Sequence, residues 1–178
     1  MSKNLEQFPA KVCLTAAGCL IHEDRVLLVK HKKVGTWLCP GGHIEENELP
    51  HRAAEREFWE ESGVRVEAYD PFQPEATDDS QYLPSPFLTN LHWVSRDNYE
   101  RRVNQGVETE NTKIWSNGCE QHLNFLYLVK PVGAIEHQLN EKEVSDIRWF
   151  YQEELEQLSL FGNVRLEINR AFKLINNQ

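Results

Sequence analysis

The sequence predicts an α/β or α+β layered domain, because segments typical of strands lie before, between and after segments typical of helices. The chain has 178 residues, which is close to the usual size of one domain and allows one sizeable core. Hydrophobic residues make up 40% of it, enough apolar surface for a packed globule rather than a disordered chain. No internal repeat or low-complexity linker interrupts the sequence, so we expect residues 1–178 to form a single α/β domain.

The first elements predicted are two strands joined by a tight turn. Residues 11–21 and 25–30 are apolar and rich in β-branched side chains, and a polar His-Glu-Asp turn separates them. This arrangement is typical of a hairpin. Residues 32–50 follow with three glycines and two prolines, and we expect them to form a loop.

A helix and a further strand are predicted next. Residues 50–62 begin with Pro50, which suits a first helical turn, and their interior is rich in Glu and Ala. Gly63 then acts as a stop signal. Residues 64–69 alternate in polarity, which predicts a strand after the helix.

The second half of the chain begins with residues 70–118, which we expect to be a loop-rich insertion. Four prolines break its first half, and a short strand is predicted only at 87–94. The polar, Asn-rich residues 97–118 are expected to form a long loop, and such loops in compact domains are usually functional or mobile. Beyond the insertion, strands are predicted at 121–130 and 146–150 and helices at 151–158 and 164–175.

The charge of the chain is concentrated in two short segments. The formal net charge is −9, and residues 42–64 and 134–157 each carry seven acidic and two basic side chains. The acidity argues against a protein that coats DNA, because phosphate backbones are held by Lys and Arg. It does not exclude a nucleotide substrate, since a divalent metal can mediate between two anions. We therefore look for chemistry in these two segments.

The cysteine pattern and the hydropathy bear on the compartment. No apolar run approaches the roughly 18 residues that a membrane span needs, and the first ten residues hold no apolar signal core. The four cysteines form no Cys-x-x-Cys pair, so their spacing indicates no zinc site, and we expect reduced, mostly buried thiols. The expected compartment is the cytoplasm.

The predicted helix at 50–62 gathers three carboxylates. At 100° per residue, Glu57, Glu60 and Glu61 share an arc of roughly 100°. Their mutual repulsion and their place at the helix C-terminus both disfavour three anions, which predicts a compensating cation. A solvated acidic face is the alternative. The Pro40-Gly41-Gly42 loop favours a site for magnesium or manganese, because it lets the backbone approach a ligand closely.

The segment from Gly42 to Val64 resembles the Nudix box of the Nudix hydrolase family, Gly-x5-Glu-x7-Arg-Glu-U-x-Glu-Glu-x-Gly-U, in which U is a bulky apolar residue. All nine specified positions of this 23-residue motif are present. The resemblance implies an α/β/α sandwich with a mixed β-sheet. It also implies a metal-dependent enzyme that hydrolyses the pyrophosphate bond of a small nucleoside diphosphate derivative, with water activated by Mg²⁺ or Mn²⁺.

The resemblance also assigns residues. Glu57, Glu60 and Glu61 look like the metal-binding carboxylates, and the main-chain carbonyl of Gly41 resembles a further oxygen ligand. Arg56 would hold the carboxylates in place by charge-assisted hydrogen bonds. Glu48 matches the remaining acidic position of the box, which in the family supports catalysis.

Several residues outside the box stay open between a functional and a structural role. Glu141 or Glu143 is a candidate base or ligand, or part of a solvated loop. Trp37 is a candidate to stack on a base, or to be buried beneath the glycine loop. The lysines at 30, 32 and 33 would steer phosphates or simply end a strand, and the histidines at 43, 92 and 122 are expected to be structural.

The substrate is the least defined part of the prediction. Tyr82 stands 18 residues after Val64, where family members that act on dinucleoside polyphosphates tend to carry a tyrosine. A Nudix-like module that senses a nucleotide without cleaving it is the alternative function, and an acidic protein-interaction domain is a third. The complete glutamate set argues against the sensor. Since family members often pair, a homodimer is expected.

Overall fold

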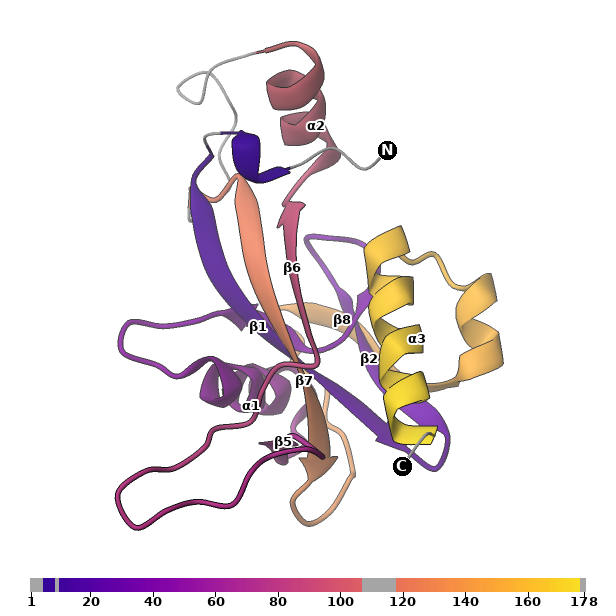
Figure 1. The fold of residues 1–178 in the computed structure, drawn as a ribbon. Helices are drawn as coiled ribbons and strands as arrows, with labels where there is room; N and C mark the ends of the chain where they lie inside the picture. Colours follow the sequence, from indigo (N-terminus) through magenta and orange to yellow (C-terminus); the bar gives the residue numbers. More distant parts are fainter. Residues whose placement is uncertain (1–4, 9, 107–117, 177–178) are drawn as a thin grey trace.

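The computed structural model describes residues 5–8, 10–106 and 118–176, and a mixed sheet forms its middle layer (Figure 1). Strands β1 (Val12–His22) and β7 (Gln121–Pro131) run parallel over nine paired residues at the centre of this sheet. All other strand pairs that the structure describes are antiparallel, so the sheet is mixed, as the family resemblance implies; six further strands take part in it. These strands are β2 (Arg25–His31), β3 (Trp37–Leu38), β4 (Gly41–His43), β5 (Val66–Tyr69), β6 (Leu88–Trp93) and β8 (Val144–Tyr151).

Two helices cover opposite faces of the sheet. Helix α1 (Pro50–Ser62) lies on one face and α3 (Gly162–Asn176) on the other (Figure 1). Side chains alternate along β1, so that Leu20 belongs to a core shared with α1 and Cys19 to a core shared with α3. We call these the α1-side core and the α3-side core. The predicted α/β class and the α/β/α sandwich are therefore confirmed.

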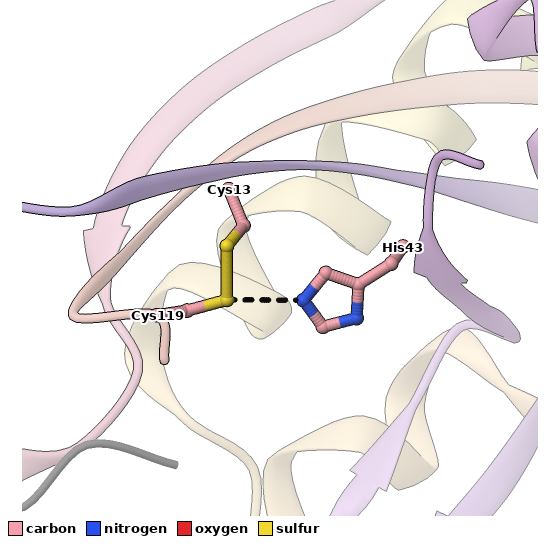
Figure 2. A group of neighbouring side chains, drawn as sticks. All are labelled: Cys13, His43 and Cys119. Atoms are coloured by element: carbon pink, nitrogen blue, oxygen red, sulfur yellow. Dashed lines mark hydrogen bonds between the residues drawn. A yellow bond between two sulfur atoms is a disulfide. The ribbon is translucent and has the colours of Figure 1, made fainter. Parts of the chain in front are cut away.

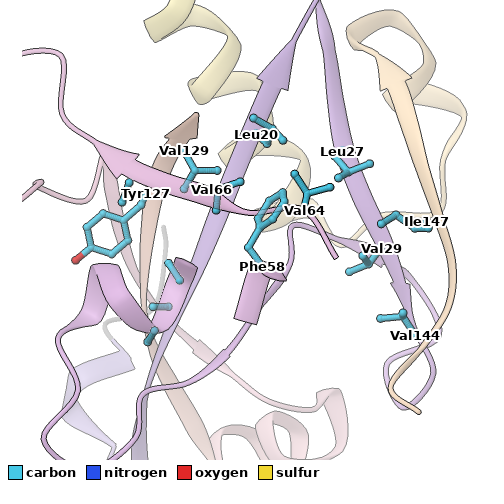
Figure 3. Close-up of a cluster of buried hydrophobic side chains, with 14 residues drawn as sticks. Leu20, Leu27, Val29, Phe58, Val64, Val66, Tyr127, Val129, Val144 and Ile147 are labelled. Carbon is cyan, nitrogen blue, oxygen red and sulfur yellow. The ribbon is translucent and has the colours of Figure 1, made fainter. Parts of the chain in front are cut away.

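The α1-side core explains the position of the predicted helix. Phe58 is fully buried in it, between the central strands and the residues that follow α1 (Figure 3). A Cβ built on Gly18 of β1 would lie 2.9 Å from the Phe58 ring, so a glycine is what lets this ring sit against the strand. Helix α1 is thereby held tightly against the sheet.

Most predicted elements agree with the structure. Strands β1 and β2 form the expected hairpin, and Glu23 and Asp24 of its turn have φ values of 48° and 58°, as a twisted two-residue turn requires. The helix predicted at 50–62 coincides with α1. Gly63 ends it in the left-handed conformation, with φ of 71°, and its N–H donates to the Trp59 carbonyl.

Three predictions from local pattern differ from the structure. The expected loop at 32–50 contains β3 and β4, since pairing with β2 and β1 stabilises strands too short to show any periodicity. The expected loop after 97 instead begins with α2 (Arg96–Tyr99) and the π-helical turn η2 (Glu100–Asn104), while 107–117 lie outside the described residues. The helix predicted at 151–158 is the 3₁₀-helix η4 (Gln152–Gln157).

The prediction that all cysteines are reduced is wrong for two of them. Cys13 and Cys119 form a disulfide with a Cα–Cα distance of 5.7 Å, whereas Cys19 and Cys39 are free (Figure 2). The bonded cysteines are 106 positions apart in sequence and meet because β1 and β7 are neighbours. Separately, no helix in the described part of the chain has the length and hydropathy needed to cross a membrane.

Candidate functional site

The candidate site lies where the C-terminal half of α1 meets β4. Helix α1 carries Glu57, Glu60 and Glu61, and β4 pairs with β1 so that Ala17 lies opposite Gly41. Strands β1 and β4 can lie this close only because residue 41 is glycine: a Cβ on Gly41 would lie 2.5 Å from the carbonyl oxygen of Ala16. The local sequence therefore brings a bare strand backbone against the acidic face of a helix.

Arg56 connects the acidic residues of this site. Its guanidinium donates from Nε and Nη2 to the two carboxylate oxygens of Glu48, at 2.8 and 2.9 Å. Its Nη1 donates to Glu57 at 2.8 Å and to Glu60 at 3.1 Å. Two parallel hydrogen bonds from one guanidinium fix both the orientation and the distance of the Glu48 carboxylate, which a single lysine ammonium would not do. The hydrogen bonds from Arg56 also lower the pKa of Glu48, so that Glu48 stays ionised.

Glu61 is the most buried of the three helix carboxylates. The residue is 2% exposed, and the backbone N–H of Gly41 donates to its Oε2 at 3.0 Å. Burial raises the pKa of Glu61 to about 8, and the negative charges of Glu57 and Glu143 add to the shift. Without a cation, this carboxylate is therefore poorly suited to carry its charge at neutral pH.

Glu57 is held against the next glycine. A Cβ on Gly42 would lie 2.5 Å from the carboxyl carbon of Glu57, so a larger residue at position 42 would force this carboxylate to move. Burial raises the pKa of Glu57 as well, although its hydrogen bond to Arg56 opposes the shift. Glu60 is different, since its side chain is 43% exposed.

These residues fit a magnesium or manganese ion. Hard divalent cations take oxygen ligands, and the site offers three carboxylates beside the backbone of Gly41. Burial raises the pKa values of Glu57 and Glu61. A bound cation would lower these pKa values again, because it compensates the negative charge of the ionised carboxylates. The Glu57 carboxylate lies against Gly42 and accepts a hydrogen bond from Arg56 at 2.8 Å, so its position is restrained in this structure.

Glu143 also lies close to the site, although it is distant in sequence. Its charge raises the pKa values of both Glu57 and Glu61. The loop that carries it is anchored on either side: Lys32 N–H donates to the Glu143 carbonyl at 2.9 Å, and Asn140 Nδ2 donates to the Glu60 carbonyl at 3.0 Å. The second acidic segment thus meets the first, whereas Glu141 uses its carbonyl to accept from the Lys32 ammonium.

Two of the sequence-predicted residues lie elsewhere. Trp37 is 8% exposed in the α3-side core, with its ring edge-on to Phe150 at 4.8 Å, so little of the ring is free to stack on a base. Tyr82 is 46% exposed, and its neighbours Gln81 and Leu83 line a groove with Glu55. Glu55 is two positions from Glu57 and so lies about 200° around the helix from it.

The sequence analysis missed a polar row on the α3 side of the sheet. Thr15 of β1 donates to Asn124 of β7 at 3.1 Å, and the adjacent Asn90 of β6 donates to Glu167 of α3. Glu167 is 5% exposed, and burial raises its pKa. The sequence does contain a sign of this row, because Thr15, Asn90 and Asn124 are polar residues within predicted strands that are otherwise mostly apolar.

The fold and the site together define a class of protein: an α/β/α sandwich that presents an arginine-bound carboxylate cluster on a loop and helix. Comparison with known proteins agrees, since residues 14–172 match the model of the NUDIX domain. The chain belongs to the NUDIX family.

One solved structure and two curated proteins similar to this chain agree with its membership of the NUDIX family. A solved NUDIX-family hydrolase from Clostridium perfringens is 26% identical, with a TM-score of 0.67, over 91% of this chain and 97% of that one. Diphosphoinositol polyphosphate phosphohydrolase 2 from Rattus norvegicus is 31% identical over 66% of this chain and 65% of its own length. A MutT-like protein from Streptomyces ambofaciens is 44% identical over 30% of this chain and 36% of its own. The chain thus spans less than two thirds of both of these curated relatives.

Proposed function

We propose that this protein is a metal-dependent pyrophosphohydrolase that cleaves the P–O–P linkage of a small nucleoside diphosphate derivative. The observation that carries the proposal is the arrangement of Glu57, Glu60 and Glu61 on one helix face, joined to Glu48 through Arg56. A solvated acidic face would not need Glu61 buried, the Glu57 side chain only 13% exposed, or its neighbouring glycines in such close contact. Family membership and the named hydrolases among the relatives support the same reaction class.

The residues of the chain have separate roles in this proposal. Glu57, Glu60 and Glu61 would hold Mg²⁺, with Mn²⁺ as a substitute, and the Gly41 carbonyl would be the further ligand. When bound, the ion would polarise phosphoryl oxygens and help a water molecule to lose its proton. Arg56 is a positioning residue, because it orients the carboxylates through its hydrogen bonds, and Glu48 orients Arg56.

Residues outside the box would contribute to substrate binding. Glu143 is our candidate for an additional ligand or base, because its charge acts on Glu57 and Glu61. Roles for Trp37 and Tyr82 in binding the substrate stay proposals, and the burial of Trp37 makes stacking the weaker of the two.

A substrate panel tests the proposal. It contains nucleoside triphosphates, ADP-ribose, dinucleoside polyphosphates and sugar nucleotides, together with a diphosphoinositol polyphosphate because the rat relative is named for that substrate. We expect Mg²⁺-dependent release of phosphate or nucleotide from at least one compound, and loss of that release in Glu61→Gln. Tight binding without cleavage of any compound would instead indicate a nucleotide-sensing module.

The remaining expectations concern the cellular form of the enzyme. We expect it to act in the cytoplasm on a small nucleotide-type substrate and to form a homodimer. Size-exclusion chromatography with light scattering tests the dimer, and a monomer at all accessible concentrations would contradict it.

A further inference from the structure

Sulfur and imidazole groups from four chain segments meet on the α3-side face of the sheet, outside the carboxylate cluster. Cys13 of β1 lies opposite His122 of β7, and His122 lies opposite His92 of β6. Cys119 comes just before β7, and His43 comes from β4 (Figure 2). Neither the carboxylate site nor the sheet core needs so many soft ligands in one place, which suggests a separate role.

The three nearest of these groups are close enough to share an ion. The potential ligand atoms of Cys13, Cys119 and His43 all lie within 4.8 Å of one another, and His43 Nε2 is 3.2 Å from the Cys119 sulfur. The next imidazole is that of His122, whose ring centre is 5.0 Å from that of His43. Figure 2 shows the His43 ring directed at the sulfur pair.

We propose that Cys13, Cys119 and His43 form a zinc site when their disulfide is reduced, and that the disulfide is the metal-free form of the same site. Two thiolates and an imidazole nitrogen are ligands that Zn²⁺ prefers, and a tetrahedral ion with three protein ligands keeps a fourth position. His122, whose ring centre lies 5.0 Å from that of His43, is our candidate for that fourth ligand. Spacing along the sequence gives no zinc motif here, because the ligands are gathered by strand pairing.

The change in geometry that the proposal requires is small. Zn–S and Zn–N distances of about 2.3 and 2.1 Å place ligand atoms in a tetrahedral site roughly 3.6 Å apart. The His43–Cys119 distance of 3.2 Å is already near that value. The two sulfurs have to move apart, and reduction removes the bond that holds them together, while the ligand atoms of Cys13 and His43 already lie within 4.8 Å of each other.

The reaction that opens the site balances with a phosphine as reductant. The phosphine gives two electrons to the Cys13–Cys119 bond and becomes a phosphine oxide with oxygen from water, while the two sulfurs take up the two protons of that water. Zn²⁺ then displaces both thiol protons as it binds. In the cell, a pair of small thiols would supply the same two electrons and become a disulfide.

The zinc site and the carboxylate cluster use different atoms of β4. The backbone carbonyl of His43 accepts a hydrogen bond from Arg56 at 3.0 Å, on the side of α1. The His43 side chain shares the opposite face with its partner Thr15 and with Cys13. A metal bound by the sulfurs can therefore be tested independently of magnesium bound by the glutamates.

The test uses Co²⁺ as a spectroscopic substitute for Zn²⁺, in excess Mg²⁺ to occupy the carboxylates. After reduction by a phosphine, we expect one equivalent of Co²⁺ to produce a thiolate-to-cobalt charge-transfer band, which carboxylates cannot produce, and one equivalent of Zn²⁺ to abolish it. The same wild-type protein, reoxidised, should lose the band. This comparison needs no variant, so misfolding cannot account for its outcome.

Variants then assign the ligands. Cys13→Ser and Cys119→Ser should lower zinc affinity by more than about 100-fold, beyond the cost of losing an outer-shell partner, whereas Cys39→Ala, at a free cysteine outside the cluster, should not. Glu61→Gln should keep the cobalt band, which separates this proposal from the proposed hydrolase activity. Absence of the band in reduced wild type, or its survival in Cys13→Ser, would overturn the zinc site.

Discussion

Gly42 and Glu57 are packed so closely that a single methyl group on Gly42 would lie 2.5 Å from the Glu57 carboxyl carbon. We therefore expect Gly42→Ala to displace this carboxylate and to lower kcat by about 100-fold, the effect of an active-site misplacement of roughly 1 Å. Gly162→Ala is the matched control, since a Cβ there meets nothing within 4 Å. Equal turnover in the two variants would show that Glu57 does not need its present position.

Glu61→Gln removes one charge from a buried position without changing its size. We expect turnover to fall by at least about 100-fold because a metal ligand is lost, while thermal stability in the absence of metal does not fall. Glu46→Gln, at an exposed position within the box, is the control for removing a glutamate nearby. Steady-state kinetics with Mg²⁺ and differential scanning calorimetry provide the two readouts, and near-normal turnover in Glu61→Gln would contradict the site.

The raised pKa of Glu61 predicts a pH dependence of stability in the metal-free protein. The folded-state pKa is about 8 against an ordinary value of 4.5, so the folded state retains a proton that the unfolded state releases between these values. The stability contributed by Glu61 is therefore fully present below pH 4.5, and it is lost as the pH rises towards 8. Denaturant unfolding across this range should show that the free energy of unfolding falls with pH more in the wild type than in Glu61→Gln, whose amide does not titrate.

Magnesium should change this profile in a defined way. Because the ion binds the ionised carboxylate, it should stabilise the protein more at pH 8 than at pH 6, and its binding at pH 6 should release a proton. Calorimetry in buffers of different ionisation enthalpy measures that proton. A Mg²⁺ affinity that does not change with pH would show that Glu61 is not a ligand.

Arg56 and Glu48 should act as one unit. Arg56→Lys replaces a two-pronged contact with a single ammonium, and Glu48→Gln weakens the same contact from the other side. We expect each to reduce kcat and the double variant to be little worse than either, with a coupling of about 1–3 kcal/mol. Fully additive losses in a double-mutant cycle would indicate that the two residues contribute independently. Arg52→Lys, whose side chain contacts Glu55 on another part of the helix, is the control.

Elements with a strong local pattern could be predicted from the sequence. The helix at 50–62 has a proline start, a glycine stop and Phe58 on its buried side, and it begins and ends where predicted. Strands β3 and β4 could not be predicted, because two or three residues show no periodicity and owe their conformation to pairing with β2 and β1. The helical turns after Ser95 were missed for a similar reason, since polar residues at a cap also occur in loops.

The candidate site divides in the same way. The spacing of residues 42–64 by itself determined the family and the grouping of Glu57, Glu60 and Glu61, because helical periodicity is a local property. Only the tertiary structure decided which carboxylates are buried, since their surroundings come from β4 and from the loop that carries Glu143. It also brought together Cys13 and Cys119, which are 106 positions apart. Contacts between distant segments depend on sheet pairing and packing, and no local pattern in the chain encodes them.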